Sequence, residues 1–80
     1  MQTKLLPLSA MRPGQSGCVA EIRVQGALRR RLFDLGLIPR TRVLCRFRAP
    51  SGSPVAFLVR GTVIALRRRD AACIFAEAEV

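Results

Sequence analysis

The stretch that decides the fold is CVAEIRVQGALRRRLFDLG, residues 18–36, because its hydrophobic period changes half-way along. From Cys18 to Gln25 every second residue is apolar, which is typical of a β-strand with one buried face. We therefore predict a strand over this segment that ends at Gly26. Its inward face is predicted to hold Cys18, Ala20, Ile22 and Val24.

The segment 27–35 changes to a helical period. Its apolar residues Leu28, Leu32 and Leu35 stand at i, i+4 and i+7, so they share one stripe of a helix. Gly36 follows where a left-handed C-cap is expected, and Pro39 prevents the helix from continuing. A helix this short is not stable alone in water, so we expect its leucines to pack on the core. Leu37 and Ile38 are open between core and contact surface.

Beyond Pro39 the period returns to two. The segment 41–48 is predicted to turn Val43, Cys45 and Phe47 inward and Arg42, Arg46 and Arg48 outward. Further short strands are predicted at 55–60, 63–66 and 71–78, separated by the turn-rich loop 49–54 and the polar break 67–70. Two prolines limit the stretch 5–14 to an edge segment.

Four or five short strands, with one short helix after the first long strand, favour a mainly β fold that closes into a small barrel and so removes exposed edges. The chain has 80 residues and no linker, so residues 1–80 are predicted to form a single domain. No apolar run approaches the roughly 20 residues of a membrane span. The N-terminus lacks the pattern of a signal peptide, so a soluble, cytoplasmic protein is expected.

The three cysteines, Cys18, Cys45 and Cys73, are odd in number and widely spaced, which does not suggest a disulfide framework. We interpret them as reduced, small core hydrophobes. Without histidine or a C-x-x-C pair, no metal site and no cofactor are predicted, although a three-thiolate cluster assembled in space is left open. No general base, activated nucleophile or Walker-type loop is present in the sequence, so the protein is predicted not to be an enzyme.

The order of these elements resembles the FeoA family. The matching residues are Leu8-Ser9, Pro13-Gly14, Gly17, Val19, Arg31-Leu32, Leu35-Gly36-Leu37 and Pro39, followed by Ala49-Pro50, Gly52, Pro54, Gly61, Ala65-Leu66-Arg67, Ala71 and Ile74. The resemblance covers almost the whole chain. It implies an SH3-like β-barrel with a helical insertion. The same fold also serves as a terminal domain of some metal-dependent repressors.

The resemblance further implies a cytosolic accessory role in bacterial ferrous iron uptake. The implied partner is the membrane transporter FeoB, whose soluble part is a GTP-binding domain. Direct iron binding, regulation of GTP hydrolysis and the oligomeric state are left open. One residue departs from the family pattern, because Arg40 follows Pro39 where glycine is usual. If that position has a positive φ, Arg40 is expected to cost about 1 kcal/mol.

A net charge of +9 points to anionic partners. Arginine suits carboxylates and phosphates through its planar fork of donors. We expect an arginine face, aided by apolar loop residues, to meet an acidic patch on the transporter or the membrane surface beside it. The predicted contact residues are Leu37, Ile38, Arg40, Arg42, Arg46, Arg48, Ala49 and Pro50.

A nucleic-acid-binding barrel is the alternative, because basic charge favours it. Single-strand binders usually stack bases on exposed rings. This chain has four phenylalanines, with no tyrosine or tryptophan. Phe47 and Phe57 share their alternation with predicted core residues, which counts against specific nucleic-acid binding.

Overall fold

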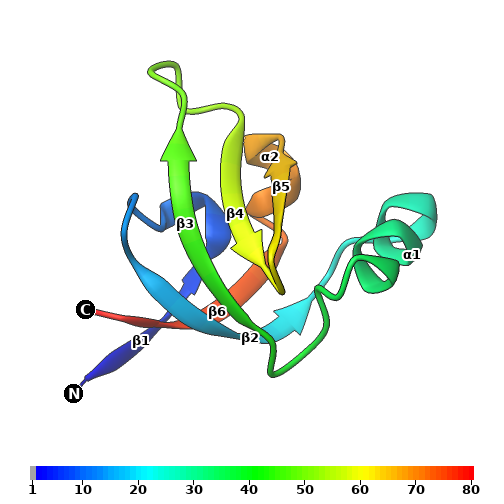
Figure 1. The fold of residues 1–80 in the computed structure, drawn as a ribbon, viewed down its shortest axis with the longest axis horizontal. Helices are drawn as coiled ribbons and strands as arrows, with labels where there is room; N and C mark the ends of the chain where they lie inside the picture. Colours follow the sequence, from blue (N-terminus) through cyan, green and yellow to red (C-terminus); the bar gives the residue numbers. More distant parts are fainter. Residues whose placement is uncertain (1) are drawn as a thin grey trace.

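A computed structural model describes residues 2–80 as one six-stranded antiparallel sheet with a short α-helix beside it (Figure 1). Met1 lies outside the described residues, so a single domain over residues 1–80 stays a prediction. The elements in chain order are β1 (Thr3–Pro7), the 3-10 turn η1 (Leu8–Ala10), β2 (Ser16–Ile22), α1 (Gly26–Asp34), β3 (Arg42–Arg48), β4 (Val55–Val59), β5 (Thr62–Leu66), α2 (Arg68–Ala71) and β6 (Ile74–Glu79).

The sheet order is β1-β6-β2-β3-β4-β5. This confirms a mainly β fold with one short helix after the first long strand. There are six strands because the N-terminal edge segment pairs along its length with β6. Within the described chain β1 and β5 do not pair with each other, so the predicted closure is incomplete and two edges remain. The predicted polar break 67–70 is mostly helical, because α2 begins at Arg68, and α2 packs against η1.

The core lies inside the curve of this sheet. Its largest fully buried side chains are Phe57, Leu8, Met11, Leu32, Leu37 and Ile74. Each such side chain contributes about 1.5–3 kcal/mol when it leaves water. The predicted inward residues of β4, namely Val55, Phe57 and Val59, are all buried. Strand β6 turns Ile74, Ala76 and Ala78 inward, which settles a register that the sequence left unclear.

A β-bulge corrects the predicted face of β2. The pairing with β6 shifts between Val19 and Glu21, and a bulge reverses the alternation on one side of it. Val19 is therefore buried, whereas Cys18 and Ala20 are exposed, contrary to the prediction. Beyond the bulge the predicted phase is right, because Ile22 and Val24 are buried.

The helix α1 ends in a Schellman motif, which explains the position of Leu37. The amide of Leu37 donates to the Leu32 carbonyl at 2.8 Å, and the amide of Gly36 donates to the Phe33 carbonyl at 3.0 Å. Gly36 has φ of 98°, the left-handed value this cap requires. The motif brings Leu37 and Leu32 into the core, each 1% exposed. Leu37 is thus a core residue.

The rest of the helix stands away from the sheet (Figure 1). Leu28 and Leu35 are only partly buried against the core, so the predicted stripe is confirmed with Leu32 as its centre. At the start of the helix Arg29 donates to the Ile22 carbonyl at 2.8 Å. Its guanidinium also lies 4.8 Å from the centre of the Phe33 ring. The hydrogen bond to Ile22 ties α1 to the end of β2, whereas the contact with Phe33 lies within the helix.

Candidate interaction site

Most of the arginines lie on the surface. Every arginine except Arg29 and Arg48 is exposed. Residues 2–80 form only two ion pairs, Arg23 with Glu21 and Arg42 with Glu79 at 2.8 Å. Glu21 raises the pKa of Arg23, first through its hydrogen bond and then through its charge. The other exposed arginines have no carboxylate partner among residues 2–80 and are therefore free to meet an anionic surface.

The predicted contact residues separate into two groups, one at each end of β3. Ile38 and Arg40 lie in the loop before the strand, and Ala49 and Pro50 lie in the loop after it (Figure 1). A seven-residue strand is roughly 20 Å long. Arg42 and Arg46 are exposed along the strand between these loops. Leu37 is in the core, so it cannot contact a partner.

Arg40 occupies the strained conformation that the sequence analysis anticipated. Its φ is 75°, and its amide donates to the Val19 carbonyl at 2.7 Å. The residue is exposed. The turn thus keeps the backbone that glycine would favour while presenting a guanidinium to solvent.

Arg48 does not lie on the outer arginine face, because a second bulge intervenes. The pairing of β3 with β4 shifts between Cys45 and Phe47. The guanidinium of Arg48 turns inward and donates to the Ser9 carbonyl at 2.7 Å and to the Met11 carbonyl. Its Nε is buried and has no hydrogen-bond partner among residues 2–80. Arg48 thus fixes η1 to the end of β3 and is not a contact residue.

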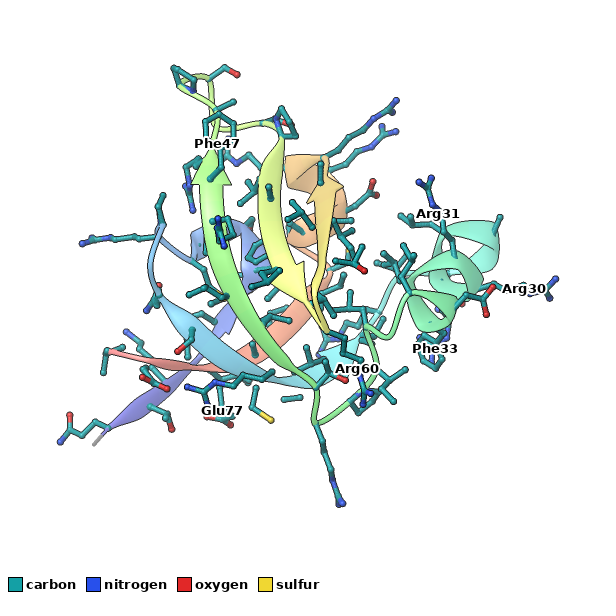
Figure 2. The ribbon with its side chains drawn as sticks, in the orientation of Figure 1. Arg30, Arg31, Phe33, Phe47, Arg60 and Glu77 are labelled. Atoms are coloured by element: carbon teal, nitrogen blue, oxygen red, sulfur yellow. The ribbon has the colours of Figure 1, made fainter. Side chains whose placement is uncertain are left out.

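The same bulge turns Phe47 outward. Its side chain is 52% exposed, contrary to the prediction of an inward position. Figure 2 shows it beside β3, close to the loop that follows. It lies next to the exposed Arg46. An aromatic ring is therefore available to a partner, which removes part of the argument against nucleic-acid binding.

The cysteines occupy two kinds of environment. Cys45 is buried, as predicted, and its thiol points to the Met11 carbonyl at 3.7 Å. Burial raises its pKa, partly opposed by the Arg48 charge and by a hydrogen bond from the Phe47 backbone. Cys18 and Cys73 are exposed, so the prediction that all three are core residues is wrong. Among residues 2–80 no group of three or more Cys, Asp or Glu side chains is close enough to hold a metal ion.

A slot between α1 and β5 was not identified from the sequence. It is lined by Leu28, Arg31, Leu32 and Leu35 of the helix and by Thr62–Leu66 of the strand. Its volume is about 290 Å³. We call it the α1–β5 slot. A strand such as Thr62–Leu66, which contains no charge and no proline, can accept another strand if it lies at an edge of the sheet. The sequence of one strand does not show whether it lies at an edge.

Comparison with known proteins fits this architecture. The family model of the FeoA domain matches residues 6–78. The chain belongs to the FeoA family. Its members are associated with ferrous iron transport, and the fold is that of an SH3-like domain. Among curated proteins, none matches this sequence significantly.

Solved structures show the same fold. The FeoA protein of Chlorobium tepidum has 29% sequence identity and a TM-score of 0.87, over 94% of this chain and 71% of that one. The zinc-bound FeoA of Stenotrophomonas maltophilia has 26% identity and a TM-score of 0.77, over 99% and 96%. A manganese-dependent transcriptional repressor has 19% identity and a TM-score of 0.83, over 99% of this chain and 44% of that chain. This last likeness shows the fold alone.

Proposed function

We propose that this chain is a cytoplasmic accessory protein of ferrous iron uptake that binds a FeoB-type transporter and has no catalytic role of its own. The observation that carries the proposal is the exposed arginine surface along β3, in a chain of net charge +9 that belongs to the FeoA family. Between Gln2 and Val80 no helix has the length and hydropathy that a membrane crossing needs. The transporter would supply the membrane part.

The proposed contact surface consists of Arg40, Arg42 and Arg46 with Ile38, Ala49, Pro50 and Phe47. The three arginines extend from the turn before β3 to its far half. Arg40 and Arg46 have no carboxylate partner among residues 2–80, and Arg42 between them is exposed although it pairs with Glu79, so the row presents positive charge to an acidic surface. Phe47 and Pro50 add apolar contact at one end of the row. Exposed charges attract over a Debye length of about 8 Å, so they steer the encounter while apolar contacts fix the orientation.

The test is a pull-down from native membranes of a strain that encodes the transporter, with the purified chain as bait. The variant carries Arg40→Glu, Arg42→Glu and Arg46→Glu. A matched control carries Arg30→Glu, Arg68→Glu and Arg69→Glu, which changes the net charge equally at exposed positions outside β3. If each of the three arginines of β3 and its preceding turn forms an exposed ion pair worth about 0.5 kcal/mol with the transporter, the variant that reverses them should bind about tenfold more weakly.

Raising the salt concentration should reduce binding of the wild type and of the control alike. Equal weakening by both charge-reversal sets would mean that only net charge matters and would remove the proposed surface. Unchanged binding by both sets at low salt would remove the electrostatic contribution altogether. Failure of the wild-type chain to retain the transporter would contradict the function itself.

A second candidate function is single-stranded nucleic-acid binding, which the exposed ring of Phe47 beside Arg46 favours. Stacking on an aromatic ring is worth about 1–3 kcal/mol per base. If this function is real, Phe47→Ala should weaken binding to a random single-stranded oligonucleotide by at least fivefold at physiological salt. Binding that depends on salt but not on Phe47 would be nonspecific adhesion.

A further inference from the structure

We propose that the α1–β5 slot binds an extended, acidic segment of a partner protein, which adds as a strand to the free edge of β5. The inference rests on the slot and on the ladder of the sheet. It does not depend on the arginine surface along β3, nor on the transporter being the partner.

The backbone of β5 has unused hydrogen-bonding groups on this side. Arg60 and Gly61 form a two-residue turn with φ of 48° and 80°, so Val59 and Thr62 close the hairpin as a hydrogen-bonded pair. In an antiparallel ladder such pairs alternate with pairs that do not bond each other. The N–H and C=O groups of Val63 and Ala65 therefore point away from β4. In the described chain no strand pairs with them.

Nothing in β5 blocks strand addition. Exposed edges are usually protected by lysine, proline, a bulge or extreme shortness. β5 has the sequence TVIAL with a regular register against β4. Val63 is 58% exposed, so an apolar, β-branched side chain faces solvent at this edge. Such a strand is a template for pairing with another chain.

The opposite wall of the slot suits the side chains of an added strand. Leu28 and Leu35 are only partly buried, so the apolar wall of α1 is incomplete by itself. An extended segment places alternate side chains on opposite faces, and those on one face would cover these leucines. Strand addition thus satisfies both the backbone groups of β5 and the exposed apolar surface of α1.

Charge selects the partner. Arg31 lines the slot, and Arg60 and Arg67 lie exposed at the two ends of β5. Figure 2 places Arg31 on the protruding helix and Arg60 at the hairpin turn. A segment with carboxylates among its apolar residues would meet all three guanidinium groups. A second copy of this chain would bring the same positive charges together, at a net charge of +9 each.

The probe is a blocked heptapeptide of alternating glutamate and valine, titrated into the ¹⁵N-labelled full chain at low millimolar concentration. We expect saturable shifts of the Val63 and Ala65 amides and slower hydrogen exchange at both. A peptide with lysine in place of glutamate should bind at least tenfold more weakly. A glutamate-valine peptide that is N-methylated at every amide should not bind, because neither of its edges can then donate to the ladder.

Variants of the chain locate the site. Ala65→Pro removes one outward N–H and leaves the hydrogen bonds to β4, so affinity should fall about tenfold. Ala65→Glu keeps the amide and repels the peptide, which provides a readout if the proline variant does not fold. Arg31→Glu should weaken binding at least threefold, whereas Arg46→Glu on β3 changes the net charge equally and should not.

Three results would overturn the proposal. These are absence of saturable shifts, equal binding of the lysine peptide, and shifts that survive both substitutions of Ala65. A concentration-dependent dimer that Ala65→Pro abolishes would show that a second copy occupies the edge instead. Because these measurements use no membrane, their failure leaves the transporter pull-down unaffected, and the converse also holds.

Discussion

The two edges of the sheet are built differently, and the difference separates a protected side of the molecule from a pairable one. The β1 edge carries a charge at Lys4 and lacks a donor at Pro7, two devices that discourage another strand from adding. The chain then turns at once into η1, whose Leu8 is fully buried. The β5 edge has neither device, and the helix beside it leaves a slot.

The elements next to the two edges are also fixed differently. η1 is held by Leu8 and Met11 in the core and by hydrogen bonds from Arg48. The helix α1 depends on a single fully buried residue, Leu32, with Leu28 and Leu35 only partly buried. Few buried contacts correspond to low local stability, and binding elements are commonly drawn from such regions. We therefore expect α1 to be the more mobile and the more readily displaced of the two.

The largest expected effect removes the one fully buried side chain within α1. Leu32→Ala should lower the free energy of unfolding by about 2–5 kcal/mol, because a fully buried leucine leaves a cavity. Urea denaturation followed by circular dichroism measures this loss. Leu28→Ala on the same helix is the matched control and should cost clearly less, since Leu28 is partly exposed. A near-neutral Leu32→Ala would mean that α1 does not pack on the sheet at all.

The second-largest expected effect on stability concerns η1, the element next to the β1 edge. Arg48→Met should lower stability by about 2–3 kcal/mol, because the Ser9 and Met11 carbonyls lose a charged donor. Arg46→Met, two residues away and exposed, should change stability by no more than about 0.5 kcal/mol. Chemical denaturation of both variants gives the comparison. Equal effects would show that the inward contacts of Arg48 do not hold η1.

The elements of the fold show which features can be predicted from the sequence and which cannot. The strand-to-helix change at Gly26, the Gly36 cap and the inward residues of β4 follow from period and local backbone chemistry, and all were predicted correctly. The positions of Cys18, Phe47 and Arg48 were wrong because a bulge in each strand reverses the alternation on one side of it, before the bulge in β2 and beyond it in β3. A bulge is fixed by pairing with a distant strand, which one segment does not encode.

The candidate site was predictable only in its chemistry. Arginine content indicated an anionic partner, and Arg40, Arg42 and Arg46 are indeed exposed. The α1–β5 slot was missed because it requires two facts of tertiary structure. One is the strand order that leaves β5 at an edge, and the other is the helix position opposite that edge.

A smaller effect concerns the turn that joins α1 to β3. Arg40→Gly should raise the free energy of unfolding by about 1 kcal/mol, because glycine adopts a positive φ without a Cβ penalty. Arg40→Ala removes the same charge but keeps the Cβ, so it should bring no gain. Thermal unfolding at high salt, which screens the charge change, distinguishes the two. Equal gains would attribute the effect to charge and not to the backbone.

The smallest expected effect is a pH dependence of the free energy of unfolding. It comes from Cys45, whose thiol points to the Met11 carbonyl on the η1 side of the molecule. Burial raises the pKa of the Cys45 thiol in the folded protein, so the folded state keeps its proton longer than the unfolded chain does. The resulting stabilisation is complete below the ordinary thiol pKa, about 8.5, and is lost as pH rises through the higher folded value.

A background of Cys18→Ser and Cys73→Ser isolates this titration and prevents disulfide exchange at alkaline pH. In that background the free energy of unfolding should decline with pH above about 8.5 by at most about 1.4 kcal/mol per unit from this group. Adding Cys45→Ala should remove that part of the decline while lowering stability at every pH. Parallel profiles for the two proteins would mean that Cys45 ionises as easily when folded as when unfolded. The dry, fixed environment assigned to the η1 side would then be wrong, and with it the contrast to the open β5 edge.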